Sequence, residues 1–457
     1  MENDNIEVCI LAAGMGSRMR SSRPKALQLL GGRPLLEHLL DTVDSLNPSR
    51  IHVVIGQEAQ QIRDAFSGRD NINWVLQEER LGSGHAVMQA VDQFSDDSKV
   101  LILLGDAPLV KRDTLDAMLQ LDCDLGVLTV DQENPFNYGR IIRDDADNVL
   151  AIIEERDATD EQRKITEINT GGMVANSKGL KQWLGELSCD NDQGEYLLTD
   201  IVSIAAKLAC SVSTHKTTDT IEVTGINTFS QLSSLEREFQ FSNASILMEQ
   251  GVHIIDPYRF NQRGTVIVGR DILIDINVVL EGRVELADGV SIGPNCIIKD
   301  SIIGANTIIK ADSILDETVT EAECSVGPFA RLRPGTMLKH KVAVGNFVEV
   351  KKSTLGEGTK ASHLSYLGDS TIGSAVNIGA GTITCNYDGV NKFETHIGND
   401  VFVGSNSSLV APVTISEGVT IGAGSTITKD VEADVLAIGR GRQKIISNWQ
   451  RPVKKEK

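Results

Sequence analysis

The feature that most constrains this chain is a six-residue period of aliphatic side chains that runs through its second half. Glycine often follows the aliphatic residue, as in "IGPNCI" and "IGAGST". Such a hexapeptide period is typical of a parallel β-helix, in which each repeat forms one flat strand and a turn. Three repeats form a triangular coil, and the aliphatic side chains point inward. The series comprises Val268, Ile274, Leu280, Leu286, Ile292, Ile298, Ile303, Ile309, Leu315, Val326, Leu332, Leu338, Val344, Val350, Ile397, Val403, Leu409, Ile415, Ile421 and Ile427.

The composition agrees with a narrow solenoid. Only 4% of the 457 residues are aromatic, and the inside of such a coil has room for isoleucine, valine and leucine but for little more. The flat faces of these solenoids usually pack around a threefold axis, so we expect a closed cyclic oligomer. Residues 385–396, "CNYDGVNKFETH", interrupt the period. Insertions in solenoids form loops, and we expect this one to project from the coil and to carry function.

The first half has a different pattern, in which strand-like and helix-like segments alternate up to about residue 227. This alternation predicts a mostly parallel sheet with helices on both faces. Residues 229–250 have the hydrophobic spacing of a linking helix. The predicted strands include "IEVCILAAG", "RIHVVIG", "NINWVLQ" and "KVLILLGD", and the predicted helices include "PLLEHLLDTVDSL" and "HAVMQAVDQF".

Charge and cysteine content limit the classes of partner and compartment. The formal net charge is −19, which argues against a nucleic-acid surface or an anionic membrane as the main partner but not against a small anionic ligand. The seven cysteines are scattered without metal-type spacing, as expected of a reduced cytosolic protein. The N-terminal apolar run is too short for a signal sequence or a membrane span. We therefore expect a soluble cytoplasmic protein.

Residues 9–25, "CILAAGMGSRMRSSRPK", place two glycines and two well-spaced cations directly after the first predicted strand. The stretch is not a dinucleotide fingerprint, because Met19 stands where a third glycine is needed, and it is not a Walker loop. Glycines let backbone N–H groups approach an anion closely, and a following helix start adds positive potential. Arg18 and Lys25 add full charges, so the stretch suits a triphosphate. The alternative is a tight strand-to-helix turn.

These residues carry a family resemblance. "LAAGMGSRM" followed by "RPK" is similar to the signature of sugar-nucleotide pyrophosphorylases, L-A-A-G-x-G-[ST]-R-M and then P-K. Together with the hexapeptide half, residues 6–457 resemble the bacterial family of bifunctional N-acetylglucosamine-1-phosphate uridylyltransferases / glucosamine-1-phosphate acetyltransferases. Further stretches that agree are "QEERLGSGHA", "LLGDAPL", "NYGRI", "IIEERDA", "EINTGG", "NDQGEYLLTD" and "EVTGIN".

The resemblance implies an α/β protein in three parts. Residues 1–227 would form a Rossmann-like nucleotidyltransferase domain, and residues 228–251 a linker helix. Residues 252–457 would form a left-handed parallel β-helix of hexapeptide repeats with a C-terminal tail, the acetyltransferase domain. A homotrimer is the oligomer that the family implies.

In the first domain, the resemblance implies that a sugar 1-phosphate attacks the α-phosphorus of UTP and releases pyrophosphate. Arg18 and Lys25 would neutralise charge on the pyrophosphate side, and Asp106 with Asn227 would hold Mg²⁺. The substrate-binding residues would be Leu11, Ala12, Ala13, Gly14 and Lys25 at the nucleotide, Gln77, Gly82 and Ser83 at the uracil, Leu104, Gly105, Asp106 and Asn227 at the centre, and Gly139, Glu154 and Asn169 at the sugar.

Three of these assignments have a simpler alternative. Asp106 follows an apolar strand and would be a turn aspartate. Asn227 would cap the N-terminus of the following helix, which does not exclude metal binding. Glu154 lies in a charged run of the kind that usually forms a solvated face.

In the second domain, the resemblance implies acetyl transfer from acetyl-CoA to the amine of glucosamine 1-phosphate. That amine is largely protonated at neutral pH, so a general base is useful. His363 would be this base, and Glu349 would orient its imidazole. The sugar phosphate would be held by Arg333, Lys351, Tyr366 and Asn377, and acetyl-CoA by Ala380, Asn386, Tyr387, Ser405, Ala423 and Arg440. The alternatives are a structural histidine and solvated cations at the solenoid edges.

Two other functions compete with a two-site enzyme that makes UDP-N-acetylglucosamine. One is a monofunctional pyrophosphorylase whose β-helix serves regulation or assembly, and the other is a non-enzymatic scaffold. The projecting loop, His363, Lys351 and Arg440 oppose the first alternative. Arg18, Lys25, Asp106 and Asn227 oppose the second.

The chain departs from the family pattern at Ser17, Ser83, Ser362 and Met15. Met15 stands where lysine is frequent, which removes one cation near the pyrophosphate, and Ser83 must replace a threonine hydroxyl. The tail over residues 440–457 is basic, and it would either meet the phosphates of CoA or form a disordered end. Cys385 is assigned no role.

Overall fold

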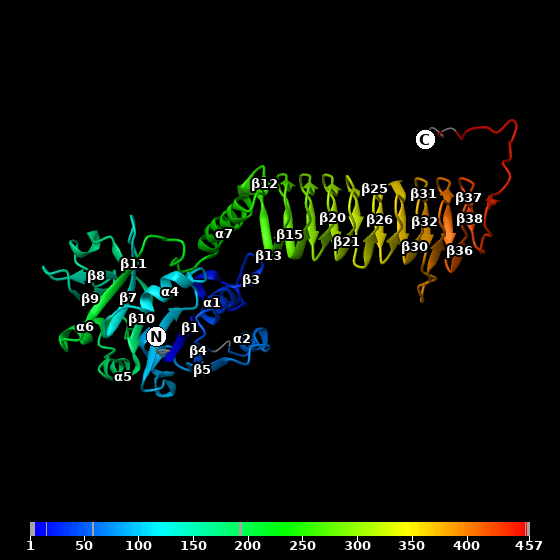
Figure 1. Ribbon diagram of the computed structural model, residues 1–457. Helices are drawn as coiled ribbons and strands as arrows, with labels where there is room; N and C mark the ends of the chain where they lie inside the picture. The colour runs from blue at the N-terminus through cyan, green and yellow to red at the C-terminus, as the bar shows by residue number, and fades with distance from the viewer. Residues whose placement is uncertain (1–4, 15, 57–58, 192–193, 453, 455–457) are drawn as a thin grey trace. The chain divides into compact units, whose positions relative to one another are not determined.

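The computed structural model describes residues 5–14, 16–56, 59–191, 194–452 and 454. The chain divides into two compact units, residues 1–239 and 240–457 (Figure 1). Each unit has its own hydrophobic core. The predicted linking segment contains α7 (Phe229–Glu249), and the boundary between the units falls within this helix.

The first unit is built on one mixed β-sheet. Its strand order is β11 (Val212–Thr217), β7 (Leu125–Asp131), β10 (Glu167–Asn176), β6 (Ser98–Leu104), β1 (Asn5–Leu11), β4 (Arg50–Ile55) and β5 (Ile72–Leu76). β10 runs antiparallel to β6 and β7, whereas β1 is parallel to β4 and β6. The mostly parallel sheet is thus confirmed, with β10 as the exception. The chain reaches β10 from the hairpin of β8 (Arg140–Arg143) and β9 (Val149–Ile153) rather than through a helical crossover.

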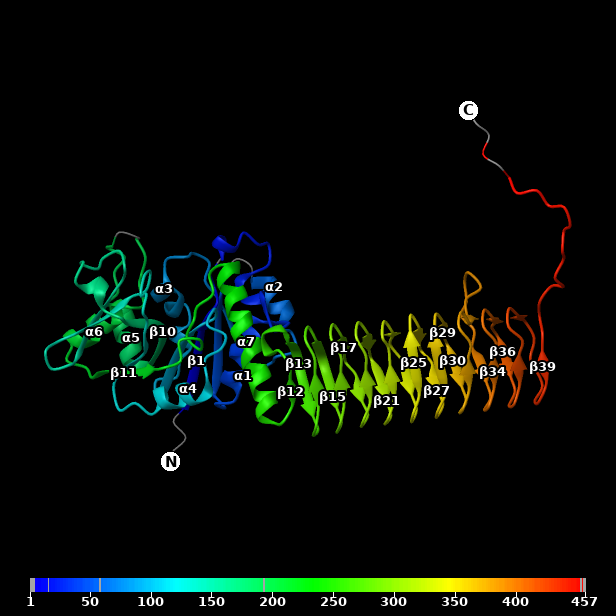
Figure 2. The same ribbon diagram turned by 90° about the horizontal axis from the view of Figure 1, so that it is seen from above.

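Helices cover both faces of this sheet (Figure 2). One face packs against α1 (Leu35–Asp44), α2 (Ala59–Ala65) and α4 (Arg112–Leu119), and the other against α3 (Ser83–Met88), α5 (Ser177–Gly185) and α6 (Asp200–Lys207). In α1, Leu36, Leu39, Leu40 and Val43 recur at helical spacing and are fully buried. Because both faces of the sheet are covered, ligands can reach it only at the strand ends and loops.

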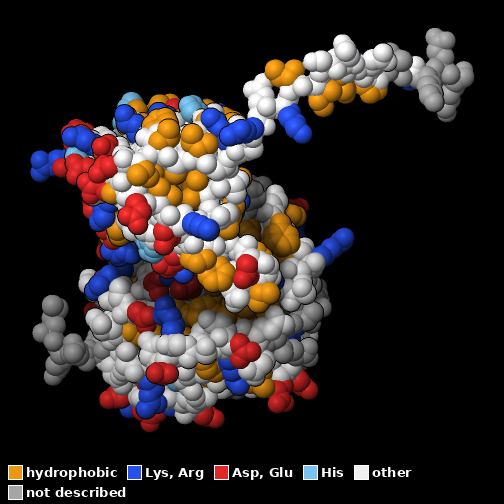
Figure 3. Space-filling view, turned by 90° about the vertical axis from the view of Figure 1, so that its right-hand side faces the viewer, with side chains coloured by type: hydrophobic (Ala, Val, Ile, Leu, Met, Phe, Trp, Pro, Cys, Tyr) orange, Lys and Arg blue, Asp and Glu red, His pale blue; other side chains and the backbone are white. Residues whose placement is uncertain are grey.

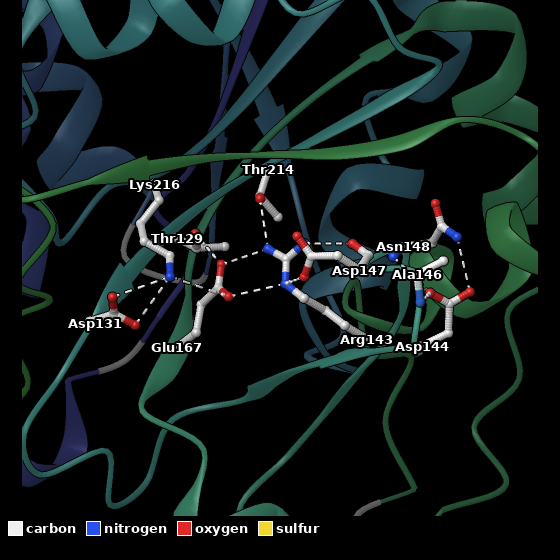
Figure 4. Close-up of polar contacts among 10 residues, drawn as sticks. All are labelled: Thr129, Asp131, Arg143, Asp144, Ala146, Asp147, Asn148, Glu167, Thr214 and Lys216. Atoms are coloured by element: carbon white, nitrogen blue, oxygen red, sulfur yellow. Dashed lines mark hydrogen bonds and ion pairs between the residues drawn. The ribbon is translucent and has the colours of Figure 1, made fainter.

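A polar cluster around Glu167 fixes β10 to its neighbours (Figure 4). The Glu167 carboxylate accepts hydrogen bonds from Arg143 Nη2 at 2.8 Å and from Thr129 Oγ1 at 2.8 Å. Lys216 Nζ lies 3.5 Å from the same carboxylate. Burial alone would raise the pKa of Glu167, but the hydrogen bonds from Arg143 and Thr129 hold it below the ordinary value. The cluster ties four strands together two residues before Asn169, a predicted sugar ligand.

The second unit is a parallel β-helix. One of its sheets contains β12 (His253–Ile254), β14 (Leu273–Ile274), β16 (Ser291–Ile292), β19 (Ile308–Ile309), β22 (Ser325–Val326), β25 (Ala343–Asn346), β28 (Lys360–His363), β31 (Asn377–Ile378), β34 (Phe402–Val403), β37 (Thr420–Ile421) and β39 (Leu436–Ala437). The other sheet runs from β13 (Asn261–Val268) to β38 (Thr426–Ile427). Ile274 pairs with Ile292 and Ile292 with Ile309, so one coil takes 18 or 17 residues.

The aliphatic series lines the inside of this β-helix. Val268, in the first coil, is half-buried, and every other member of the series is buried. The predicted parallel β-helix is therefore confirmed. Further buried side chains, such as Val278, Val290 and Cys296, complete its core.

The interruption at residues 385–396 forms a loop that leaves the solenoid (Figure 1). Ile372 pairs with Ile397 across the insertion, and Tyr387 forms a β-bridge with Lys392 within it. The expected projecting loop is confirmed. Lys392 of this loop is exposed and lies against Lys351 of an earlier coil.

Beyond the last coil the chain runs out as a tail. Residues 440–452 are exposed. Hydrophobic side chains gather on this end of the solenoid (Figure 3), where Leu436 and Ile438 of the last coil are exposed. Within the ranges that the structure describes, no helix is long and apolar enough to cross a membrane.

Candidate functional site

The carboxyl ends of β1, β5 and β6 border a cleft in the first unit. Three adjoining cavities of about 90, 270 and 300 Å³ form it, and Leu104, at the end of β6, lines all three. This edge is where open α/β sheets bind their ligands. Turns after separate strands thus contribute to one site.

Each residue predicted for uridylyl transfer lies in the wall of this cleft. The central cavity is lined by Leu11, Ala12, Gly14, Lys25, Leu104, Gly105 and Asp106. The nucleotide-side cavity is lined by Leu11, Ala13, Gly14, Gln77, Gly82, Ser83 and Leu104. The sugar-side cavity is lined by Arg18, Leu104, Asp106, Gly139, Glu154, Asn169 and Asn227. The fold therefore brings together residues as far apart as Arg18 and Asn227, 209 positions along the chain.

Two cations converge on the predicted metal ligands. The ammonium of Lys25 pairs with Asp106 Oδ2 and lies 2.9 Å from Asn227 Oδ1. Arg18 Nη2 donates to the same Asn227 oxygen at 2.8 Å. The other carboxylate oxygen of Asp106, Oδ1, is buried and accepts no hydrogen bond from the part of the chain that the structure describes. Asp106 and Asn227 thus attract positive charge, and one buried oxygen of Asp106 is left without a donor.

These two side chains fit Mg²⁺. Magnesium prefers oxygen ligands, and proteins usually supply only one or two of them because phosphates and water complete the octahedron. Across the described ranges, no group of three or more His, Cys, Asp or Glu side chains is placed to hold a metal ion. A carboxylate and an amide beside a glycine-rich loop are the kind of partial site that a nucleotide-bound magnesium ion needs.

The alternative in which Asn227 caps α7 is wrong. Thr228 Oγ1 accepts the backbone N–H of Gln231 at 3.2 Å, and Gln231 Oε1 accepts the N–H of Thr228 at 3.0 Å. This reciprocal pair is a capping box, with Thr228 as the N-cap residue. Asn227 stands one residue before the cap, so its side chain is available to Lys25 and Arg18.

The glycine-rich loop is open to the cleft. A side chain at Gly14 would meet nothing within 4 Å, so a ligand can approach its backbone. Gly16 has a φ of +59°, and a Cβ there would lie 3.0 Å from Lys25 Cβ, so glycine both permits this backbone and lets Lys25 come close. The expected helix start is a single 3₁₀ turn, Ser17–Met19, which is too short to add a useful dipole. Met15, where the family pattern is broken, lies outside the described residues.

The nucleotide-side wall is tightly packed. Ser83 Oγ accepts the backbone N–H of Leu198 at 3.0 Å, so the serine hydroxyl anchors a neighbouring segment. Gln77 is buried, and its Nε2 donates to Gly82 O at 3.2 Å. Gly82 has a φ of +106°, and a Cβ there would lie only 2.5 Å from Tyr196 O. The glycine is therefore required by the packing of this wall.

On the sugar side, Glu154 is half-buried and is not part of a solvated face. It accepts a hydrogen bond from Thr199 Oγ1 at 3.1 Å. Burial, and then the negative charge of Asp200, raises the pKa of Glu154 above the ordinary glutamate value. Asn169 lies beside it in the cavity wall, and its backbone N–H donates to Gly139 O at 2.9 Å. A half-buried carboxylate with few donors is suited to accept hydrogen bonds from sugar hydroxyls.

In the second unit, His363 has a different partner from the expected one. His363 Nδ1 lies 2.7 Å from Asn346 Oδ1, and the two residues pair between β25 and β28. Glu349 instead accepts a hydrogen bond from Arg333 Nη1 at 2.8 Å. The orienting role expected of Glu349 is thus corrected, because the coil register sets Asn346 beside the imidazole. An amide oxygen on Nδ1 keeps the proton there and leaves Nε2 as the basic nitrogen.

His363 belongs to a column of residues along one corner of the solenoid. The strand register gives equivalent positions in successive coils to Asn346, His363, Ala380, Ser405 and Ala423. Arg440 Nη1 donates to Ala423 O at 2.6 Å and adds a cation at the far end of the column. The predicted base and four of the predicted acetyl-CoA residues therefore form one continuous row.

Two lysines lie together at the base of the projecting loop. Close contact with Lys351 and its like charge lower the pKa of Lys392 below the ordinary lysine value. Two ammonium groups held together attract an anion such as a phosphate. Asn386 Nδ2 donates to Asp369 and lies 3.5 Å from Tyr366 Oη, so the loop base is bound to the same coil. Sequence analysis predicted Lys351 but missed Lys392, whose only signal is its place in the interruption of the repeat.

The remaining predicted residues, and two residues that were not predicted, lie as follows. Asn377 is half-buried in β31, and Tyr387 is exposed in the projecting loop. Arg80 also lines the nucleotide-side cavity, although sequence analysis did not select it. Its position between Gln77 and Gly82 was the signal that could have found it. Asn346 had no such signal, because its role depends on the register between coils.

Comparison with known proteins follows the same division of the chain. Residues 8–167 match the MobA-like NTP transferase domain family, and residues 394–429 match the bacterial transferase hexapeptide family, which comprises six repeats. The bifunctional protein GlmU of Pseudoalteromonas atlantica is 53% identical over 98% of this chain and 99% of its own length. The chain belongs to the GlmU family. The GlmU proteins of Marinobacter nauticus and Stutzerimonas stutzeri are 51% and 52% identical, over 98% and 99% of this chain and 99% and 100% of their own.

The similarity to GlmU proteins extends over both units of the chain. The resemblance is thereby confirmed, and with it the expectation of a bifunctional enzyme with a uridylyltransferase half and a hexapeptide acetyltransferase half. The alternatives of a single activity and of a non-enzymatic scaffold are not retained.

Proposed function

We propose that the chain makes UDP-N-acetylglucosamine in two reactions at two separate sites. Residues 252–457 transfer an acetyl group from acetyl-CoA to glucosamine 1-phosphate. Residues 1–227 transfer a uridylyl group from UTP to the resulting N-acetylglucosamine 1-phosphate and release pyrophosphate, and residues 228–251 connect the two parts. The observation that carries the proposal is the convergence of Lys25 and Arg18 on the side-chain oxygen of Asn227, at the centre of the cleft.

In the α/β unit, catalysis consists of positioning and charge neutralisation. The acceptor phosphate oxygen attacks the α-phosphorus in line and pyrophosphate leaves, so no covalent nucleophile is needed. The open backbone at Gly14 faces the phosphates, while Arg18 and Lys25 offset the charge on the leaving pyrophosphate. The base of UTP lies toward Gln77, Gly82 and Ser83, and the sugar toward Gly139, Glu154 and Asn169.

Asp106 and Asn227 are the residues that would hold Mg²⁺. A bound magnesium ion supplies charge neutralisation at the phosphate oxygens. The buried Asp106 Oδ1, which has no donor within the described chain, supports this assignment. Lys25, which pairs with Asp106 in the absence of ligands, is then available to donate to the phosphates.

In the solenoid, His363 acts as the general base through Nε2. The amine nitrogen of glucosamine 1-phosphate attacks the thioester carbonyl and passes its proton to His363, a C–N bond forms, and the C–S bond breaks as CoA leaves. Asn346 holds the imidazole by accepting a hydrogen bond from Nδ1. Glu349 acts on Arg333 rather than on the histidine. The sugar phosphate lies against Arg333, Lys351, Tyr366 and Asn377, and acetyl-CoA against Ala380, Asn386, Tyr387, Ser405, Ala423 and Arg440.

We also propose a homotrimer in the cytoplasm. Flat solenoid faces favour packing around a threefold axis. Ile297 and Ile314 support this, because they pair between coils and yet are 40% and 41% exposed on the outside. The seven cysteines are free thiols, which agrees with a reducing compartment.

Two assays on the full-length chain test the proposal. Thiol release from acetyl-CoA with glucosamine 1-phosphate measures the first reaction, and magnesium-dependent pyrophosphate release from UTP with N-acetylglucosamine 1-phosphate measures the second. His363→Ala should lower the first rate by about 10²- to 10⁴-fold and leave the second unchanged. His396→Ala, which alters an exposed solenoid histidine, is the matched control and should change neither. A wild-type chain without thiol release would refute the acetyltransferase assignment, and one without pyrophosphate release would refute the uridylyltransferase assignment.

A further inference from the structure

The residue that completes the cap of α7 also lies in the wall of the substrate cleft. Gln231 lines the sugar-side cavity together with Arg18, Asp106 and Asn227, and its side chain is exposed. A side chain that only capped a helix would not need to border a ligand cavity. The cap uses the amide oxygen of Gln231, so the role of the amide nitrogen remains to be explained.

Two backbone donors fix the orientation of the Gln231 amide. The N–H groups of Asn227 and Thr228 lie 2.8 Å and 3.0 Å from Gln231 Oε1. An amide NH₂ group cannot accept a hydrogen bond, so the oxygen must occupy this side. Among the described residues, each hydrogen bond of the Gln231 side chain uses Oε1. Nε2 has no partner among the described residues, and the side chain that carries its two N–H donors borders the cavity.

The surroundings of Gln231 indicate which ligand group these donors meet. Arg18 Nη2 lies 2.8 Å from Asn227 Oδ1, and Lys25 Nζ lies 2.9 Å from the same atom. Gln231 holds the backbone of that same asparagine. The sugar 1-phosphate must approach this centre to attack UTP, so its phosphate would lie next to the neutral donor on Gln231. The remaining wall of the cavity carries Glu154 and the other predicted sugar ligands, so the phosphate is that of the sugar.

We propose that Gln231 is a further substrate-binding residue, whose Nε2 donates a hydrogen bond to the phosphate of the sugar 1-phosphate while its Oε1 caps α7. The inference rests on the proposed uridylyl transfer and adds a ligand to that site. It gives the glutamine two separable tasks. The acceptor sets the position of Asn227, and the donor binds substrate.

Glutamate separates the two tasks. At this position of a capping box, glutamate accepts the same backbone hydrogen bonds as glutamine. It lacks the N–H donors, however, and turns a negative charge toward the phosphate. Gln231→Ala removes both tasks. Gln120→Glu makes the same charge change at an exposed position after α4 and is the matched control.

The test uses these three full-length variants in the pyrophosphate-release assay and in thermal unfolding. Gln231→Glu should keep its thermal midpoint within about 2 °C of wild type. Its KM for N-acetylglucosamine 1-phosphate should rise about tenfold or more, because a hydrogen bond to a charged group is lost. Its KM for UTP should change by less than about threefold on the same reasoning. Gln231→Ala should raise the same KM and also lower the thermal midpoint, and Gln120→Glu should change neither.

Several results would overturn the inference. One is a KM for the sugar phosphate in Gln231→Glu that equals the wild-type value, and another is an equal rise in the KM for UTP. A fall in the thermal midpoint of Gln231→Glu as large as that of Gln231→Ala would show that the amide only caps the helix. A wild-type chain that releases no pyrophosphate refutes the proposed function itself, which distinguishes that failure from the others.

Discussion

Lys25 and Asp106 form an ion pair at the carboxyl end of β6, although 81 positions separate them in the sequence. The pair puts a cation on the carboxylate that is predicted to bind the metal ion. The two charges therefore offset each other within the cleft. In the proposed uridylyl transfer, Asp106 would hold the metal ion and Lys25 would donate to the phosphates, so the ion pair between them would have to open.

Asp106→Asn should impair uridylyl transfer through loss of the metal ligand. The substitution removes the charge that pairs with Lys25 and that is proposed to hold Mg²⁺. We expect the rate of pyrophosphate release to fall by roughly 10²-fold and the Mg²⁺ concentration at half-maximal rate to rise. A titration of Mg²⁺ in the assay measures both quantities, and acetyl transfer by the same variant is the internal control. An unchanged magnesium requirement would contradict the assignment of Asp106.

Asn346→Ala should slow acetyl transfer without affecting the α/β unit. The imidazole of His363 loses the acceptor that fixes its ring, so we expect kcat for thiol release to fall about 10- to 100-fold while the KM for acetyl-CoA changes little. Asn346→Asp should recover part of the rate, because a carboxylate still accepts from Nδ1. Should Glu349→Gln slow the reaction while Asn346→Ala does not, the glutamate would be the orienting group after all.

Lys392 should lose its charge at a lower pH than an ordinary lysine does. The contact with Lys351 lowers the pKa of Lys392. The KM for glucosamine 1-phosphate should therefore rise on the alkaline side before the ordinary lysine value of about pH 10.4 is reached. Lys392→Arg, which stays charged, should remove this rise. The pH dependence of kcat/KM for thiol release measures the effect. Lys429→Arg, at an exposed position, should keep the wild-type profile; identical profiles for all three proteins would count against Lys392.

Protonation of Glu154 at acid pH should weaken sugar binding. Burial and the charge of Asp200 raise the pKa of Glu154, so protonation begins above the ordinary glutamate value of about 4.3. Only the ionised carboxylate is a full acceptor for sugar hydroxyls. The KM for N-acetylglucosamine 1-phosphate should thus rise as the pH falls toward this range. Glu154→Gln should have a higher KM at neutral pH with less acid dependence. The KM for UTP, measured in parallel, is the control, and an equal acid dependence in variant and wild type would refute the role.

Glu167 should contribute to the stability of the first unit above the glutamate range and lose that contribution in acid. Hydrogen bonds from Arg143 and Thr129 outweigh burial and depress its folded-state pKa. The stabilisation is therefore present above the unfolded value of about 4.3 and is lost as the pH falls through the folded value. Glu167→Gln leaves Arg143 without its charge partner, which should lower the free energy of unfolding by about 3 kcal/mol at neutral pH.

Urea unfolding at neutral and acid pH measures this effect. Asp131→Asn removes a more exposed carboxylate from Lys216, at the edge of the same cluster, and should lower the free energy of unfolding by less than about 1 kcal/mol. An equal decrease in the free energy of unfolding in the two variants would mean that Glu167 stabilises the unit no more than the exposed Asp131 does.

Much of the fold could be predicted because its pattern is local. In the solenoid, each inward position repeats after a fixed number of residues, so Ile274 and Ile292 identified the coil without any knowledge of distant contacts. In the first unit, apolar runs marked the strands because both faces of the sheet are buried. The direction of β10 was not predictable in this way, since it depends on how the chain connects and not on which side chains are buried.

In the candidate sites, too, residues within one short stretch were predictable and contacts between distant segments were not. The glycines at 14 and 16 and the cations Arg18 and Lys25 were predicted, because their chemistry and spacing lie within one short stretch. The partner of His363 was not. One coil takes 17 or 18 residues, so a difference of one residue decides which side chain shares a corner with the imidazole, and the structure sets Asn346 there.

The sequence by itself determined the two architectures and most of the residues around each site, because periodicity and short motifs record what must be buried and what must bind phosphate. Only the tertiary structure decided the partners: Lys25 with Asp106, Arg333 with Glu349, and the Gln231 amide with the backbone at Asn227. These contacts depend on distances between segments far apart in the chain. No local pattern encodes such distances, because they follow from how the strands and coils stack.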